Sequence, residues 1–129
     1  MNNIFCICSA INGNLNGDYG VYSSEQKLEQ LLQSIASIKT YSPDDEIWVY
    51  ETSELELSDL FKDKISKQVD KLVLLHNHVE ISRQSSRDNG EPNRTGIKTL
   101  GEVVSFFTFL NDLKRSGKEY KRVFKLAGR

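Results

Sequence analysis

Four short, mainly apolar segments alternate along this chain with longer segments in which apolar residues recur at helical spacing. The short segments lie at residues 4–8, 46–50, 72–75 and 122–126. The helical patterns lie at residues 24–40, about 58–69 and 98–114. Strands without polar alternation are typical of a sheet buried on both faces, and right-handed crossovers join such strands through helices. The sequence therefore predicts an α/β fold, with a Rossmann-like, mainly parallel sheet and helices on both faces.

Local signals define the predicted helices more closely. Ser23 followed by Gln26 fits a capping box, which predicts that the first helix begins at residue 24. The buried face predicted for the second helix holds Leu57, Leu60, Phe61 and Ile65. Leu100, Val103, Val104, Phe107 and Leu110 mark the third helix by their spacing. The polar stretch from Ser82 to Thr95 predicts a loop, which at this length is usually functional or disordered.

The length of 129 residues fits one domain, so we expect residues 1–129 to form a single α/β unit. No apolar run approaches the ~20 residues that cross a bilayer, and the first residues lack the basic cluster of a signal peptide. Two cysteines do not make a disulfide framework. These features predict a cytoplasmic protein without a membrane span. Because the chain stops three residues after the last apolar run, we expect an incomplete N-terminal fragment.

Charge is divided between the two halves of the chain although the total is only −1. Residues 1–70 carry −7 and residues 71–129 carry +6. A basic half attracts anions such as phosphates, nucleotides or nucleic acid, unless folding brings the two signs together. One interpretation is therefore a non-catalytic α/β module that binds a protein or nucleic acid. Its contact residues would be Arg83, Arg87, Arg94, Lys114, Arg115, Lys118, Lys121 and Arg122.

Familiar nucleotide and metal motifs are absent or incomplete. The chain has no Walker sequence, which argues against a P-loop nucleotidase. Cys6 and Cys8 share one face of the first predicted strand, where they fit small core residues better than soft metal ligands. His76, His78 and Glu80 would align on an extended segment, so a zinc site remains an alternative to an exposed loop.

Open parallel sheets bind their ligands beyond the carboxyl ends of the strands. Here those ends carry Ser9-Ala10-Ile11-Asn12, Glu51-Thr52-Ser53, and Phe124-Lys125-Leu126-Ala127-Gly128-Arg129. Thr95-Gly96-Ile97-Lys98-Thr99-Leu100-Gly101-Glu102 opens the third predicted helix. With these segments the chain resembles the N-terminal, nucleotide-binding half of nucleotide-sugar-dependent glycosyltransferases of the A-type fold, and most closely their bacterial or viral polysaccharide-type members. The most distinctive match is the stretch Tyr120-Lys121-Arg122-Val123-Phe124-Lys125-Leu126-Ala127-Gly128-Arg129.

The resemblance implies which residues hold a nucleotide-diphospho-sugar. The first-strand segment that surrounds the nucleoside matches Ser9, Ala10, Ile11 and Asn12. Glu51 and Thr52 match the second-strand end that holds the base or ribose, and Lys98 matches a basic residue facing the diphosphate. The residues implied for the diphosphate and sugar are Lys125, Gly128 and Arg129.

The resemblance also implies the reaction, which is sugar transfer to an acceptor hydroxyl in glycan or polysaccharide synthesis. The usual Asp-x-Asp metal clamp is replaced by Leu126-Ala127-Gly128, so no metal ligand is named, and a Mg²⁺ or Mn²⁺ cofactor is doubtful. No catalytic base is assigned, since that group comes from the C-terminal half of such enzymes. We therefore expect this chain alone to bind nucleotide without transferring sugar.

Two expectations concern partners. The uncovered last strand predicts a homodimer that buries it, because buried strands need cover on both faces. Few aromatic residues interleave with the basic residues of the 82–95 loop, which argues against single-stranded nucleic acid as the ligand.

Overall fold

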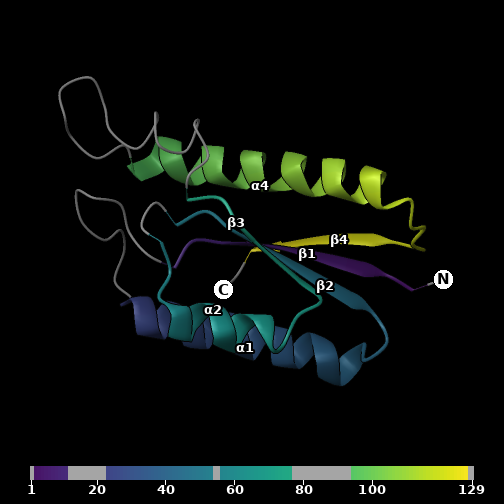
Figure 1. Cartoon of the computed structure of the whole chain (residues 1–129), viewed down its shortest axis with the longest axis horizontal. Helices are drawn as coiled ribbons and strands as arrows, with labels where there is room; N and C mark the ends of the chain where they lie inside the picture. Colours follow the sequence, from purple (N-terminus) through teal and green to yellow (C-terminus); the bar gives the residue numbers. More distant parts are fainter. Residues whose placement is uncertain (1, 12–22, 54–55, 77–93, 128–129) are drawn as a thin grey trace.

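The computed structural model describes residues 2–11, 23–53, 56–76 and 94–127, and for residues 94–100 it describes the backbone alone. Four strands form one sheet in the order β3-β2-β1-β4, and every neighbouring pair is parallel (Figure 1). The strands are β1 (Ile4–Ser9), β2 (Glu46–Glu51), β3 (Lys71–Leu74) and β4 (Val123–Ala127). The parallel α/β fold predicted from the sequence is confirmed, with strand ends that differ by one residue.

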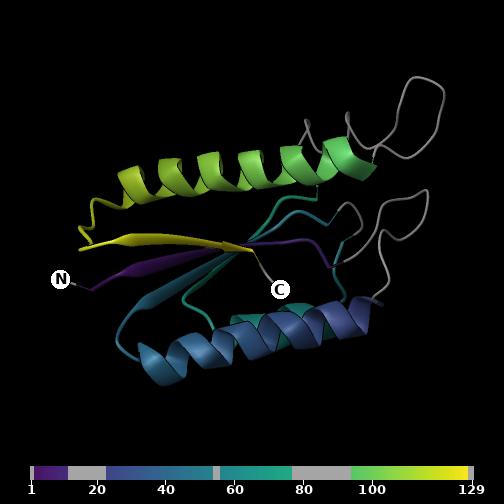
Figure 2. The ribbon, with the colours of Figure 1, turned by 180° about the vertical axis from the view of Figure 1, so that it is seen from behind.

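Helices cover both faces of this sheet, which gives three layers (Figures 1 and 2). One face carries α1 (Ser24–Tyr41) and α2 (Asp59–Ser66), and the other carries α4 (Arg94–Ser116). The capping box predicted for α1 is present, because the Ser23 hydroxyl accepts a hydrogen bond from Gln26 N while Gln26 bonds back to Ser23 N. In the described part of the chain, no helix is long and apolar enough to cross a membrane.

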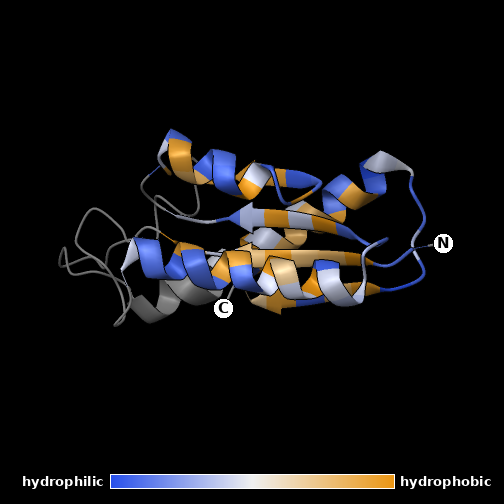
Figure 3. Cartoon of the chain, turned by 90° about the horizontal axis from the view of Figure 1, so that it is seen from below, coloured by the Kyte–Doolittle hydropathy of each residue, from blue (hydrophilic) through white to orange (hydrophobic). Residues whose placement is uncertain are grey.

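Each face of the sheet has its own apolar core, and the strands between the helices are the most hydrophobic part of the molecule (Figure 3). The alternate residues of a strand point to opposite faces. On the α1/α2 face, Ile7, Ile47 and Val49 pack against buried residues of those helices. On the α4 face, the sheet contributes Ile4, Cys6, Cys8, Trp48 and Tyr50, and the helix contributes Val104 and Phe109.

The face predicted for α2 is partly wrong, and α4 buries only part of its apolar residues. Leu60 is 60% exposed on α2, because the two turns of this helix bury Ile65 instead, and Leu57 is buried before the helix begins. On α4, Val103, Phe107 and Leu110 are exposed, and the buried stripe runs through Val104, Ser105 and Phe109. Both helices carry apolar residues on more than one side, so spacing alone does not single out the side that meets the sheet.

The helix predicted over residues 98–114 begins four residues earlier, at Arg94, and ends at Ser116. The last two residues of the predicted 82–95 loop therefore belong to α4, while residues 82–93 lie outside the described part of the chain.

Candidate functional site

The strand order creates a reversal between β1 and β4. The chain leaves β1 toward β2 and β3 on one side, then returns through α4 to β4 on the other side of β1. In open parallel sheets, ligands bind beyond the carboxyl ends of the strands at such a reversal. The candidate site is therefore the edge of the sheet where β1, β2 and β4 end.

Backbone and hydroxyl groups tie the ends of β1 and β2 together. The carbonyl oxygen of Ser9 accepts hydrogen bonds from Thr52 N at 2.8 Å and from Thr52 Oγ1 at 3.1 Å. Ser9 is buried and Thr52 is half-buried. Ala10, which follows Ser9 in the sequence, is exposed. Of the residues implied for the nucleoside, Ser9, Ala10, Ile11, Glu51 and Thr52 are thus brought together, and Asn12 lies outside the described residues.

Glu51 is a buried carboxylate at the centre of this edge, with 1% of its surface exposed. Its Oε1 accepts hydrogen bonds from Ile11 N at 2.8 Å, Ser53 N at 3.2 Å and Ser53 Oγ at 2.6 Å. Burial raises the pKa of this carboxyl above its ordinary value, and the bonds from Ser53 and Ile11 oppose that rise. Oε1 therefore holds the segment after β1 in place. Glu51 Oε2 has no hydrogen-bond partner among the described residues.

The amino-terminal end of α4 reaches the same edge of the sheet. A Cβ built on Gly101 would lie 3.1 Å from Thr52 Oγ1, closer than ordinary van der Waals contact, so α4 approaches the end of β2 tightly here. Helix amino termini favour negative charge, and α1 and α2 carry Glu25 and Asp59 in their first turns. The first turn of α4 carries no acidic residue, and Lys98 follows in this end of the helix. The amino-terminal end of α4 therefore favours an anion, and no acidic side chain of its own first turn supplies one.

The residues implied for the diphosphate are only partly placed. Lys125 pairs in register with Cys6, two positions before the carboxyl end of β4, and its Nζ lies 3.5 Å from Glu102 Oε2 on α4. It is therefore set back from the edge that holds Ser9 and Thr52. Gly128 and Arg129 lie outside the described residues.

Ser53 and Gly101 have roles that the sequence interpretation did not assign to them. Ser53 bonds the Glu51 carboxylate, and Gly101 allows the close approach of α4 to Thr52. The signal for Gly101 was a glycine inside a helical pattern, which often marks a packing requirement.

The metal alternatives gain no support from the described side chains. Cys6 and Cys8 are both buried in the α4-face core, and their mutual hydrogen bond together with burial raises the pKa of Cys6. In the part of the chain that the structure describes, no group of three or more potential ligands lies together. His76 is half-buried at the end of β3, and His78 and Glu80 fall outside the described residues.

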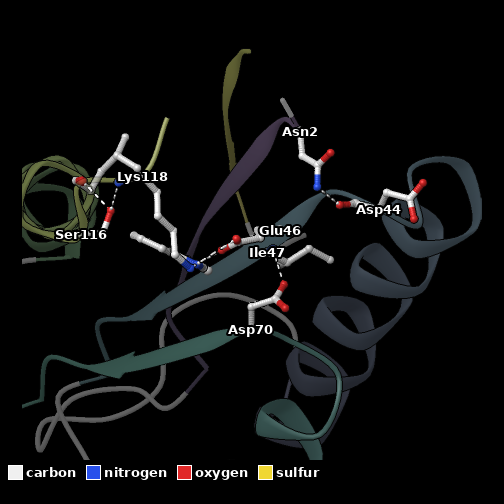
Figure 4. A network of polar contacts seen from close by, with 9 residues as sticks. Asn2, Asp44, Glu46, Ile47, Asp70, Ser116 and Lys118 are labelled. Carbon is white, nitrogen blue, oxygen red and sulfur yellow. Dashed lines mark hydrogen bonds and ion pairs between the residues drawn. The ribbon is translucent and has the colours of Figure 1, made fainter. Parts of the chain in front are cut away.

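The opposite, amino-terminal edge of the sheet holds a polar network around a cavity of about 430 Å³. Lys118 Nζ lies 3.5 Å from Glu46 Oε1, Asp70 Oδ2 accepts from Ile47 N at 2.9 Å, and the Asn2 amide donates to Asp44 O (Figure 4). Lys71, which also lines the cavity, pairs with Asp112 at 3.4 Å. These charged groups already bond within the chain, so the network closes this edge of the fold.

No protein-family model, no curated protein and no solved structure matches this chain. The class that the structure defines is thus an α/β domain with a parallel four-stranded sheet.

Proposed function

We propose that this chain is a glycosyltransferase-like domain that binds a nucleotide-diphospho-sugar at the carboxyl edge of its sheet. The observation that carries the proposal is the meeting of the ends of β1 and β2 with the amino-terminal end of α4 at the reversal of strand order. The amides at the start of a helix and a nearby lysine complement a diphosphate. The resemblance of the strand ends to the A-type fold supplies the sugar nucleotide as the particular ligand.

Each site residue has a distinct role in this proposal. Ala10 and Thr52 line the exposed surface on which the nucleoside rests. Glu51 acts as a positioning residue, since its Oε1 fixes Ile11 and Ser53. Lys98 and the start of α4 are assigned to the diphosphate, and Asn12, Lys125, Gly128 and Arg129 complete the set.

The reaction of such a domain is transfer of the sugar from the departing nucleoside diphosphate to an acceptor hydroxyl. The negative charge on that leaving group needs positive charge close by, and lysine and arginine supply it here in place of a carboxylate-bound Mg²⁺ or Mn²⁺. The proposal includes the cytoplasmic location predicted from the sequence. It assigns nucleotide binding to this chain and names no acceptor and no general base.

The test is a titration with UDP, GDP and their sugar conjugates, each with and without Mg²⁺, followed by amide NMR. Saturable shifts should appear at Ser9 to Ile11, at Thr52 and at residues 98–101. Lys98→Glu should weaken binding by about tenfold or more, since it places a like charge beside the diphosphate. Lys114→Glu, in the last turn of the same helix, is the matched control and should change the affinity little. Absence of saturable binding, or shifts confined to the cavity beside Glu46 and Lys118, would refute the proposal.

The second candidate is a non-catalytic module that uses its basic half to bind a partner. The observation that favours it is the exposure of every residue of β4, a strand that carries Lys125 and directly follows Lys121 and Arg122.

A further inference from the structure

β4 is an open edge of the sheet. It pairs with β1 on one side, and no described strand lies on its other side. Ile4 N donates to Arg122 O, and Ile4 stands opposite Val123 in the register. In a parallel ladder this arrangement turns the N–H and C=O groups of Val123, Lys125 and Ala127 away from β1. These backbone groups form an open template for one more strand.

The side chains of β4 are apolar on both faces and yet exposed. Phe124 is 38% exposed and Leu126 37%, on the face that carries α1, where Phe124 stacks on Phe5 at 5.1 Å between ring centroids. Val123 is 43% exposed on the α4 face. Large exposed apolar side chains on both faces of an edge strand indicate a partner that covers them, even though Lys125 lies between them.

All charged residues of β4 and of the two residues before it are positive. Lys121, Arg122 and Lys125 are exposed, and no acidic residue occurs between Tyr120 and Ala127. The contact of Lys125 with Glu102 spans 3.5 Å between side chains that are 37% and 55% exposed, and such surface pairs hold weakly. A lysine in the middle of an edge strand opposes pairing with apolar or basic strands, and a carboxylate on the incoming strand removes that opposition.

We propose that β4 binds an extended acidic peptide segment of a partner protein, which adds to the sheet as its next strand. Residues of the segment that point to the α1 face are apolar and cover Phe124 and Leu126. A residue that points to the α4 face is Asp or Glu and lies beside Lys125. The backbone bonds supply affinity, and the alternating side chains supply specificity. The two proposed sites share Lys125, but strand addition along the backbone of β4 does not depend on nucleotide binding.

A second copy of the chain fits this edge less well. Two-fold antiparallel pairing of β4 with itself would bring Arg122 and Lys125 of one copy close to the same basic residues of the other, and like charges across strands destabilise such pairs. The homodimer predicted from the sequence is therefore the competing outcome of the test.

The test uses a fluorescent peptide of about seven residues in which isoleucine and glutamate alternate. Fluorescence anisotropy should show saturable binding, with NMR shifts at residues 122–127. A peptide with lysine in place of glutamate should bind at least about tenfold more weakly. A peptide with proline at a position that bonds to β4 should also lose affinity, because proline has no N–H to donate. Equal binding of the proline peptide would overturn strand addition.

Variants of the protein complete the test. Lys125→Glu should weaken binding of the glutamate peptide and improve binding of the lysine peptide. Lys64→Glu, exposed on α2, is the matched control and should change neither. Equal binding by Lys125→Glu and the unchanged protein would overturn the proposal. A dimer would also overturn the proposal. This outcome requires that sedimentation shows a dimer at micromolar concentration and that the peptide causes no NMR shifts at the amides of β4.

Discussion

At the scale of single residues, the candidate site is organised by a carboxylate that faces the protein. Glu51 has 1% of its surface exposed, and its Oε1 gathers three hydrogen bonds from Ile11 and Ser53. Donors around a buried carboxylate stabilise its charge, while burial destabilises that charge. Burial outweighs the donors here, so the pKa of Glu51 is raised. The residue therefore holds Ile11, just after β1, and links the stability of the site to pH.

Glu51→Gln should make the free energy of unfolding less dependent on pH. From the ordinary pKa of 4.5 up to the raised value in the fold, the folded chain keeps a proton that the unfolded chain loses. Stability of the unchanged protein therefore falls as pH rises through this window, by at most about 1.4 kcal/mol per pH unit from this group. Urea unfolding between about pH 4 and pH 7 measures this. As pH rises, the free energy of unfolding of the glutamine variant should increase relative to that of the unchanged protein. A constant difference would contradict the link.

At the scale of elements, α4 joins the candidate site to the core. Phe109 is fully buried and makes edge contacts with the rings of Trp48 and Tyr50, at 5.7 and 5.9 Å between centroids. The Tyr50 hydroxyl donates to Asp112 on the same helix at 2.7 Å, and burial together with this bond raises the pKa of Tyr50. These contacts hold the helix against β2 and so set the place of its amino-terminal end.

Phe109→Ala should cost about 3–5 kcal/mol of the free energy of unfolding, because it leaves a cavity beneath α4. Phe107→Ala is the matched control on the same helix. Its ring is 64% exposed, so its removal should change stability by no more than about 0.5 kcal/mol. Urea unfolding followed by circular dichroism measures both. Similar losses in the two variants would show that α4 packs through another face.

At the scale of the whole molecule, the sheet has a covered centre and two edges beyond which no described strand pairs. β1 and β2 each have a strand on both sides and a helix on both faces. β3 and β4 lie at the edges, and all of β4 is exposed. Regions that have few buried contacts open locally at lower cost than the core does. The same arrangement that protects the centre of the sheet leaves β4 available to a partner.

Hydrogen exchange should therefore be slowest in β1 and β2 and fast at the amides of Val123 and Lys125, which point away from β1. Exchange measured by NMR at low protein concentration checks this ranking. The acidic peptide should slow exchange at these two amides, whereas a nucleotide should leave them unchanged. Protection of the two amides without any peptide would show that another strand already covers β4.

Much of the fold could be predicted because the relevant signals are local. Short, mainly apolar segments marked β1, β2, β3 and β4, and the capping box marked the start of α1. The parallel direction followed from the helices between the strands. The grouping of Ser9, Thr52 and the start of α4 at one edge followed from the same rule, since parallel strands end on the same side.

The sequence by itself therefore determined which segments are strands and helices and that the strands run parallel. Only the tertiary structure decided the order β3-β2-β1-β4, the buried side of α4 and the burial of Glu51. Spacing along a helix such as α4, apolar at both Phe107 and Phe109, specifies two faces equally well, and the choice depends on the shape of the sheet it meets. From the sequence, Glu51 is a candidate ligand contact. In the folded chain its carboxylate instead bonds to groups of the protein, because donors distant in sequence, such as Ile11 N, come close to it only after folding.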